Sequence, residues 1–166
     1  MRQIDTLLET MVAYYAGDPR RIHHFLKVRA FAAMIAQAEA LNPQLMEIVD
    51  VAAIVHDIGI KIAQEKFGRC DGKLQEQEGP PVAYEMLRSI GYGQGTIDRV
   101  CYLVGHHHTY TGIDGIDYRI LVEADFLVNM FEDAYSDAAI RSAYEKIFRT
   151  ERGKWLCRRM YGVAEP

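Results

Sequence analysis

Hydrophobic positions recur along nearly the whole chain with the spacing of an α-helix. In the first predicted helix, residues 2–16, the apolar side chains share one face. Asp18-Pro19 and Asn42-Pro43 each join a good N-capping residue to a proline at the first helical position. No segment alternates convincingly between apolar and polar residues, as a half-buried strand would. The pattern therefore predicts an all-α fold of about eight or nine helices.

The remaining boundaries follow from caps, glycines and prolines. We expect helices that end near Leu41, His56 and Lys66, then a polar loop over residues 66–81, "KFGRCDGKLQEQEGPP". Pro80 or Pro81 should open the next helix, which should end near Ile90, with Gly91 as its C-terminal cap. Thr96 is expected to cap the helix that leads into three consecutive histidines. Three further helices are predicted over 118–133, from about 136, and from about 151 to 161. No linker or repeat divides residues 1–166, so we expect a single domain.

Composition narrows the class of protein. The 166 residues are 49% hydrophobic and 25% charged, with a formal net charge of -4, which is the balance of a soluble globular domain and is not the strongly basic balance of a nucleic-acid binder. No apolar run approaches the ~18 residues of a membrane span, and the N-terminal residues do not resemble a signal peptide. The three cysteines have no CxxC spacing. We therefore expect a cytoplasmic protein with reduced thiols.

Four polar residues break the apolar pattern on buried helix faces. His24 lies four residues before Val28 on one apolar stripe, His56 and Asp57 end the run "AAIVHD", and Asp125 lies within "ILVEADFLVNMF". A single buried histidine or aspartate is usually a hydrogen-bonded core residue, but several of them from three helices are harder to explain one by one. One divalent cation would compensate all four, and these ligand types suit Mn, Fe, Co, Ni or Zn.

These residues resemble the H…HD…D signature of the HD-domain superfamily of metal-dependent phosphohydrolases. "HFLKV" resembles the first-histidine helix, "AAIVHDIGI" the central motif and "LVEADFLVNM" the closing aspartate helix. The resemblance covers about residues 20–135 and leaves the flanking helices, 2–16 and 136–161, outside. It implies an HD-type helical bundle that hydrolyses a phosphate ester with a metal-activated water. It also implies that Asp57 is a catalytic ligand that can bridge two metals.

A second metal is a further option. In the subset of the superfamily that binds two or more metals, additional histidines lie between the HD doublet, His56-Asp57, and the final aspartate. His106 and His107 in "LVGHHHTY" resemble the adjacent pair of that subset, although a polar helix end with one useful histidine is the alternative. Consecutive helical residues point about 100° apart, so both can bind only if the helix ends there or if they serve different metals. Glu78 is the nearest candidate for the other added ligand, or it holds a histidine's second nitrogen.

Basic and aromatic residues near these motifs are candidates for substrate binding. Lys61 lies one helical turn after Asp57 and can face the same site, which makes it our first choice for a catalytic or phosphate-binding cation. Arg20 and Arg21 come just before His24. Tyr110 follows the triple histidine in a loop that could form a pocket rim. Solvated surface positions are the alternative for all of them. We expect Lys61, Tyr110 and Arg20 to contact the substrate.

The lead hypothesis is a phosphohydrolase acting on a nucleotide or another small phosphorylated metabolite. The first alternative is a di-iron oxygenase, because some HD-fold proteins with extra histidines use dioxygen. The second is a non-catalytic metal-binding or ligand-binding signalling module, against which the complete four-residue core argues. The sequence leaves the oligomeric state open, with a homodimer as one option.

Overall fold

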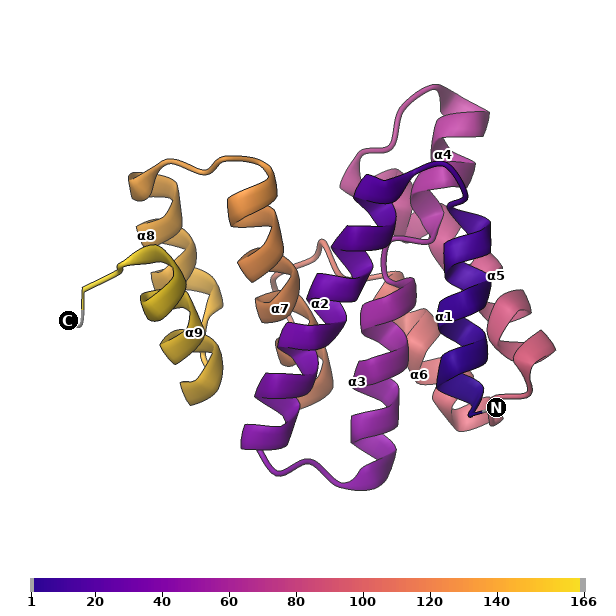
Figure 1. Cartoon of the computed structure of the whole chain (residues 1–166), viewed down its shortest axis with the longest axis horizontal. Helices are drawn as coiled ribbons and strands as arrows, with labels where there is room; N and C mark the ends of the chain where they lie inside the picture. Colours follow the sequence, from indigo (N-terminus) through magenta and orange to yellow (C-terminus); the bar gives the residue numbers. More distant parts are fainter. Residues whose placement is uncertain (1, 165–166) are drawn as a thin grey trace.

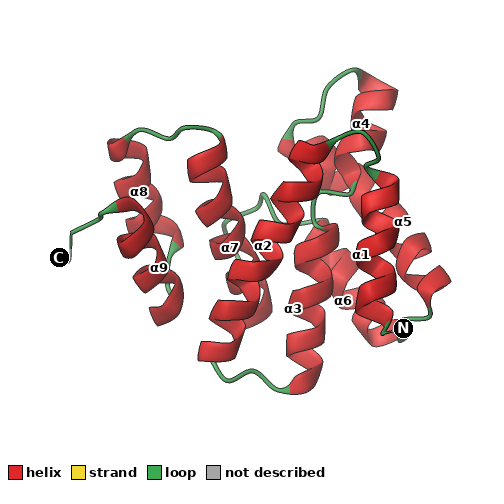
Figure 2. Cartoon of the chain, viewed as in Figure 1, coloured by secondary structure: helices red, strands yellow, loops and turns green. Residues whose placement is uncertain are grey.

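The computed structural model describes residues 2–164, and within them the chain is entirely helical, without a strand (Figures 1 and 2). The helices are α1 (Gln3–Tyr14), α2 (Pro19–Ala38), α3 (Pro43–Val55), α4 (Gly59–Phe67), α5 (Gly72–Ile90), α6 (Gln94–Val104), α7 (Ile116–Glu132), α8 (Asp137–Ile147) and α9 (Glu151–Tyr161). The prediction of an all-α fold is confirmed. Within the described residues, no helix is both long enough and apolar enough to cross a membrane.

Side-chain caps begin several helices where the sequence predicts them. The carboxylate of Asp18 accepts a hydrogen bond from the Arg21 amide at 3.1 Å, and the Asn42 side chain accepts one from Leu45 at 2.9 Å. Thr150 caps α9 in the same way. Each cap satisfies an amide that has no partner within the helix, so these boundaries are encoded locally.

The prediction of a loop over 66–81 was wrong from Gly72 onward. Asp71 caps α5 by accepting a hydrogen bond from the Leu74 amide at 3.2 Å, and the helix continues through Pro80 and Pro81 to Ile90. Proline has no amide hydrogen and normally disrupts a helix interior. Here α5 is held along its length because it packs against both α4 and α6. Tertiary packing thus overrides the local signal.

The predicted cap at Thr96 was also wrong. Helix α6 begins at Gln94, and the Thr96 hydroxyl donates to the Glu47 carboxylate at 2.9 Å instead. The helix ends at Val104, so the three histidines at 106–108 lie in the turn that follows it. Their side-chain directions are therefore set by the turn and not by helical spacing.

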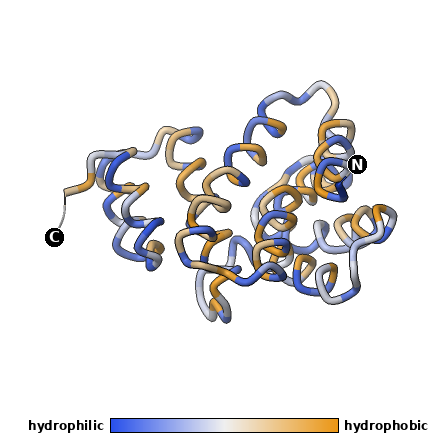
Figure 3. The backbone as a smooth tube through the Cα atoms, turned by 60° about the horizontal axis from the view of Figure 1, so that its bottom comes forward, coloured by the Kyte–Doolittle hydropathy of each residue, from blue (hydrophilic) through white to orange (hydrophobic). Residues whose placement is uncertain are grey.

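Helices α2, α3 and α7 pack on one another and carry the central part of the core, while α5 packs between α4 and α6. Figure 3 shows apolar and polar positions interleaved along the helices, as expected for amphipathic helices around a shared core. Helices α8 and α9 lie beyond α7, at the end of the molecule away from α1 (Figure 1).

One buried carboxylate ties α9 to α7. Glu123, on α7, is fully buried and accepts hydrogen bonds from the Thr150 hydroxyl at 2.5 Å and from the amides of Arg149 and Thr150 at 2.6 and 3.0 Å. These three donors satisfy a carboxylate that would otherwise be costly to bury. The contact fixes the start of α9 against the helix that also carries Asp125.

Candidate metal centre

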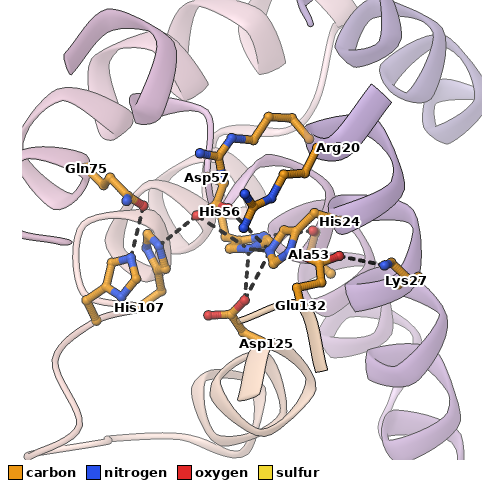
Figure 4. Close-up of polar contacts among 12 residues, drawn as sticks. Arg20, His24, Lys27, Ala53, His56, Asp57, Gln75, His107, Asp125 and Glu132 are labelled. Carbon is orange, nitrogen blue, oxygen red and sulfur yellow. Dashed lines mark hydrogen bonds and ion pairs between the residues drawn. The ribbon is translucent and has the colours of Figure 1, made fainter. Parts of the chain in front are cut away.

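The four polar residues predicted from the sequence converge on one point in the structure (Figure 4). His24 comes from α2, His56 ends α3, Asp57 lies in the turn before α4, and Asp125 comes from α7. The Nε2 atom of His24 lies 3.2 Å from His56 Nε2, 3.2 Å from Asp125 Oδ1 and 3.3 Å from Asp57 Oδ2. His56 Nε2 is 3.4 Å from Asp125 Oδ1. Segments about a hundred residues apart thus supply a single cluster.

Three buried imidazoles present the same ring nitrogen, Nε2, to this cluster. Each has its other nitrogen, Nδ1, against an oxygen: His24 against Glu132 at 2.8 Å, His56 against the Ala53 carbonyl at 2.9 Å, and His107 against the Val104 carbonyl at 2.8 Å. Carbonyl and carboxylate oxygens only accept, so Nδ1 carries the hydrogen in each ring. In a neutral imidazole the lone pair is then on Nε2, which is the arrangement of a metal-binding histidine.

The cluster contains buried atoms that lack a partner. Among residues 2–164, Asp125 Oδ1 and His107 Nε2 are buried without a hydrogen-bond partner, and the Nε2 atoms of His24 and His56 face each other at 3.2 Å. Two lone pairs at that distance repel, and an unpaired buried carboxylate oxygen is costly. A positive charge between these atoms relieves both costs.

The pKa shifts report the same need for positive charge. Burial alone would lower the pKa of His24, but the carboxylates of Asp125 and Asp57 outweigh it and raise that pKa to about 9. Burial would likewise raise the pKa of Asp125, but His24 and His56 hold it well below its usual range. A proton can satisfy one nitrogen–oxygen pair at a time. A divalent cation satisfies all the converging atoms together, so the residues present fit a metal.

A second group adjoins the first through Asp57. Ligand atoms of Asp57, His107 and His108 lie within 4.8 Å of one another, and His107 Nε2 is 3.4 Å from Asp57 Oδ1. Burial and the neighbouring His107 lower the pKa of His108 to about 4, which keeps that ring neutral near pH 7. Its Nε2 lies 3.0 Å from the Gln75 amide oxygen and its Nδ1 lies 3.4 Å from the Tyr110 hydroxyl. Tyr110 thus borders this second group.

The structure does not bring His106 or Glu78 to either group. The His106 ring stacks on Tyr102, with 4.2 Å between ring centroids, and its Nδ1 is 2.7 Å from the Tyr102 carbonyl. Glu78 forms an ion pair with Lys66 at 2.5 Å. The triple histidine therefore contributes its second and third members to the second group, because α6 ends before the first.

Lys61 and Arg20 lie outside the cluster. The Lys61 ammonium donates to the Tyr14 carbonyl at 3.0 Å and lies 4.9 Å from the centroid of the Tyr14 ring. Arg20 is exposed and pairs with Asp133 at 3.1 Å. It is one turn before His24 on α2, so both side chains share a side of that helix. Neither cation contacts the predicted metal ligands.

Sequence reasoning missed Glu132, which supports His24 from outside the cluster. Its carboxylate lies 2.8 Å from His24 Nδ1 and 2.6 Å from the Lys27 ammonium. Glu132 follows Asp125 by seven residues on α7, so the two side chains share a helix face, and Lys27 follows His24 by three on α2. That spacing was a usable signal. Gln75 and His108 had no such signal, because one lay in a segment predicted as a loop and the other in a turn.

The family model described as HD domain matches residues 21–148, well over half of the chain. No curated protein matches. Among solved structures, one described as a predicted HD superfamily hydrolase from an uncultured Thermotogales bacterium is similar, with a TM-score of 0.68 and 24% identity over 95% of this chain and 84% of that one. At this identity the likeness establishes a shared fold.

Proposed function

This chain belongs to the HD domain family, and from that premise we propose that it is a metal-dependent phosphohydrolase acting on a nucleotide or another small phosphate ester. The observation that carries the proposal is the convergence of imidazole Nε2 atoms and the Asp125 carboxylate in a buried cluster. Such a cluster is costly to maintain unless a cation occupies it. The cluster therefore supports a functional metal site.

His24, His56, Asp57 and Asp125 would hold the first cation. Asp57, His107 and His108 would hold the second, with Asp57 shared between the two sites. We leave His106 and Glu78 out of the ligand set, because neither belongs to the two groups of converging ligand atoms and Glu78 is paired with Lys66. When bound, the cations supply a water of lowered pKa and stabilise the charge that develops on the phosphoryl group.

The other residues of the site would orient a metal-binding histidine and attract the substrate. Glu132 accepts the Nδ1 hydrogen of His24, which keeps the lone pair of that ring on Nε2. Lys61 and Arg20 supply positive charge at the rim, where an anionic substrate must approach. Tyr110, which is 42% exposed, can contact the part of the substrate that remains outside the cluster.

The proposal is tested on the full chain without a histidine tag. Elemental analysis should find one or two equivalents of a transition metal, and a screen of nucleotides and phosphate esters with added Mn²⁺ should release phosphate. Asp57→Ala should lose metal and activity while keeping its helical circular dichroism. Asp98→Ala, at an exposed position on α6, is the matched control and should retain both.

Two results would contradict the proposal that the protein is a hydrolase. Iron with a mixed-valent electron paramagnetic signal, together with substrate-dependent oxygen uptake, would make the protein an oxygenase. Full metal occupancy without turnover of any phosphate ester would favour a binding module.

A further inference from the structure

The turn at residues 106–109 carries two of the three residues of the second group, His107 and His108. It lies between the end of α6 and the start of α7, so the regular hydrogen bonds of a helix do not set its path. The side chains that hold this turn from neighbouring helices therefore decide whether the two imidazoles face Asp57.

Glu76 holds the turn from α5. One oxygen of its carboxylate, Oε1, accepts hydrogen bonds from the His108 amide at 2.9 Å and from the Thr109 hydroxyl at 2.9 Å. Glu76 is half-buried, so water replaces these bonds less readily than it would at an exposed position. The preceding residue, Gln75, has its amide oxygen 3.0 Å from His108 Nε2. The first turns of α5 therefore contact both the backbone and the ring of His108.

Tyr118 holds the same turn from α7. It is only 1% exposed, and its hydroxyl contacts the carbonyl of His106 at 2.5 Å and the carbonyl of Thr109. A hydroxyl has one hydrogen to donate and carbonyls only accept, so the two oxygens share it. Burial and the nearby Glu76 carboxylate raise the pKa of Tyr118 to about 12, which keeps the hydroxyl protonated and able to donate. Tyr118 lies seven residues before Asp125, so one face of α7 carries this contact and a ligand of the first group.

We infer that Glu76 and Tyr118 are positioning residues for the second cation, because they hold the turn in the direction that brings His107 and His108 to Asp57. The inference rests on the proposed function, which places a cation in the second group. Both residues contact the turn, whereas the ligands of the first group come from α2, from the end of α3 and the residue after it, and from α7. Removing either contact should therefore weaken the second site and leave the first site intact.

The test is calorimetric titration of the metal-free full chain with Mn²⁺ alone. The wild type should bind two equivalents. Tyr118→Phe keeps the buried ring and removes only the hydroxyl, so it should weaken the second equivalent by about tenfold or more and leave the first within about twofold. Glu76→Leu should have the same effect, and it decides the question if Tyr118→Phe fails to fold.

Two control variants separate positioning from lost packing and from lost charge. Tyr161→Phe also removes a hydroxyl that donates to a carbonyl on α7, that of Leu127 at 2.5 Å, and it should bind both equivalents as the wild type does. Glu76→Gln keeps an acceptor oxygen in the place of Oε1, so it should keep both equivalents too. In metal-free protein the His108 amide should exchange about tenfold faster in Tyr118→Phe and Glu76→Leu than in either control.

The inference is overturned if Tyr118→Phe and Glu76→Leu retain the second equivalent, or if the wild type binds only one, even when phosphate esters are hydrolysed. It is also overturned if these variants lose both equivalents together, because the two residues then support the whole fold. If the variants lose the second equivalent alone and the His108 amide exchanges faster, but no ester is hydrolysed, the positioning role stands and the proposed function fails.

Discussion

Replacing Glu132 by glutamine should weaken metal binding although Glu132 is not itself a proposed ligand. Its two carboxylate oxygens each accept from a donor: His24 Nδ1 at 2.8 Å and the Lys27 ammonium at 2.6 Å. Glutamine has the same shape but only one acceptor, and its amide nitrogen is a donor. In either orientation of the amide, one donor therefore faces another donor. The variant either frees the Nδ1 hydrogen of His24 or places two donors against each other at Lys27.

The expected loss follows from the role of such outer partners. Removing the acceptor of a metal-binding histidine typically costs 10–100-fold in metal affinity, or about 1.4–2.7 kcal/mol. The Glu132 side chain is only 12% exposed, so water cannot easily replace the lost acceptor. Lys27→Met should restore part of the affinity of Glu132→Gln, because the amide can then turn its oxygen to His24 without facing the ammonium.

The assay is competition for Mn²⁺ or Zn²⁺ with a chelating dye, supported by ¹⁵N spectra that report which nitrogen of His24 carries hydrogen. Glu151→Gln is the control, since that carboxylate is 86% exposed and pairs with Lys154 across one helical turn. The reasoning is refuted if Glu132→Gln binds metal within about twofold of the wild type. It is also refuted if Lys27→Met brings no recovery in the double variant.

Three further outcomes are expected. Chelation should lower the melting temperature by about 5–10 °C relative to protein with metal at a hundred times its dissociation constant, and Asp125→Ala should abolish that difference in a calorimetric scan. Gly59→Ala should destabilise the fold by about 1–3 kcal/mol in urea unfolding, because the added carbon would lie 2.6 Å from the Gln75 carbonyl, whereas Gly95→Ala meets no atom within 4 Å and should not. Glu123→Ala should cost about 2–4 kcal/mol in the same assay, because the hydroxyl and amide of Thr150 lose their acceptor.

The first group of ligands could be predicted because His24 and Asp125 sit on apolar helix faces and the HD doublet ends an apolar run. His24 and Asp125 interrupt stripes whose other members are buried, and burial is what makes a polar residue in such a stripe informative. The helices that carry them also begin and end near their predicted bounds. Periodicity therefore carried enough information to place these side chains inside the bundle, although not to show that they meet.

The second group depended on features that periodicity does not encode. His108 lies near Asp57 because α6 ends at Val104 and the chain turns there. If the helix had continued, helical spacing would have set the directions of the three histidine side chains instead. Gln75 reaches His108 because α5 starts at Gly72, in a segment whose two later prolines argue locally against a helix. The end of α6 and the start of α5 were both predicted wrongly. At helix ends the local sequence preference is weak, and tertiary contacts decide where the helix begins or stops.

Gly59 shows how far a short motif can depend on distant packing. It follows the HD doublet by two residues and opens α4, and its backbone angles are not of the left-handed kind that would require glycine. The requirement comes from α5: a Cβ at Gly59 would lie 2.6 Å from the Gln75 carbonyl and 2.8 Å from the Gly79 amide. The same close approach brings the Gln75 side chain to His108 at 3.0 Å. A glycine that reads as part of the metal motif therefore acts by letting the helix that borders the second group come close to the first.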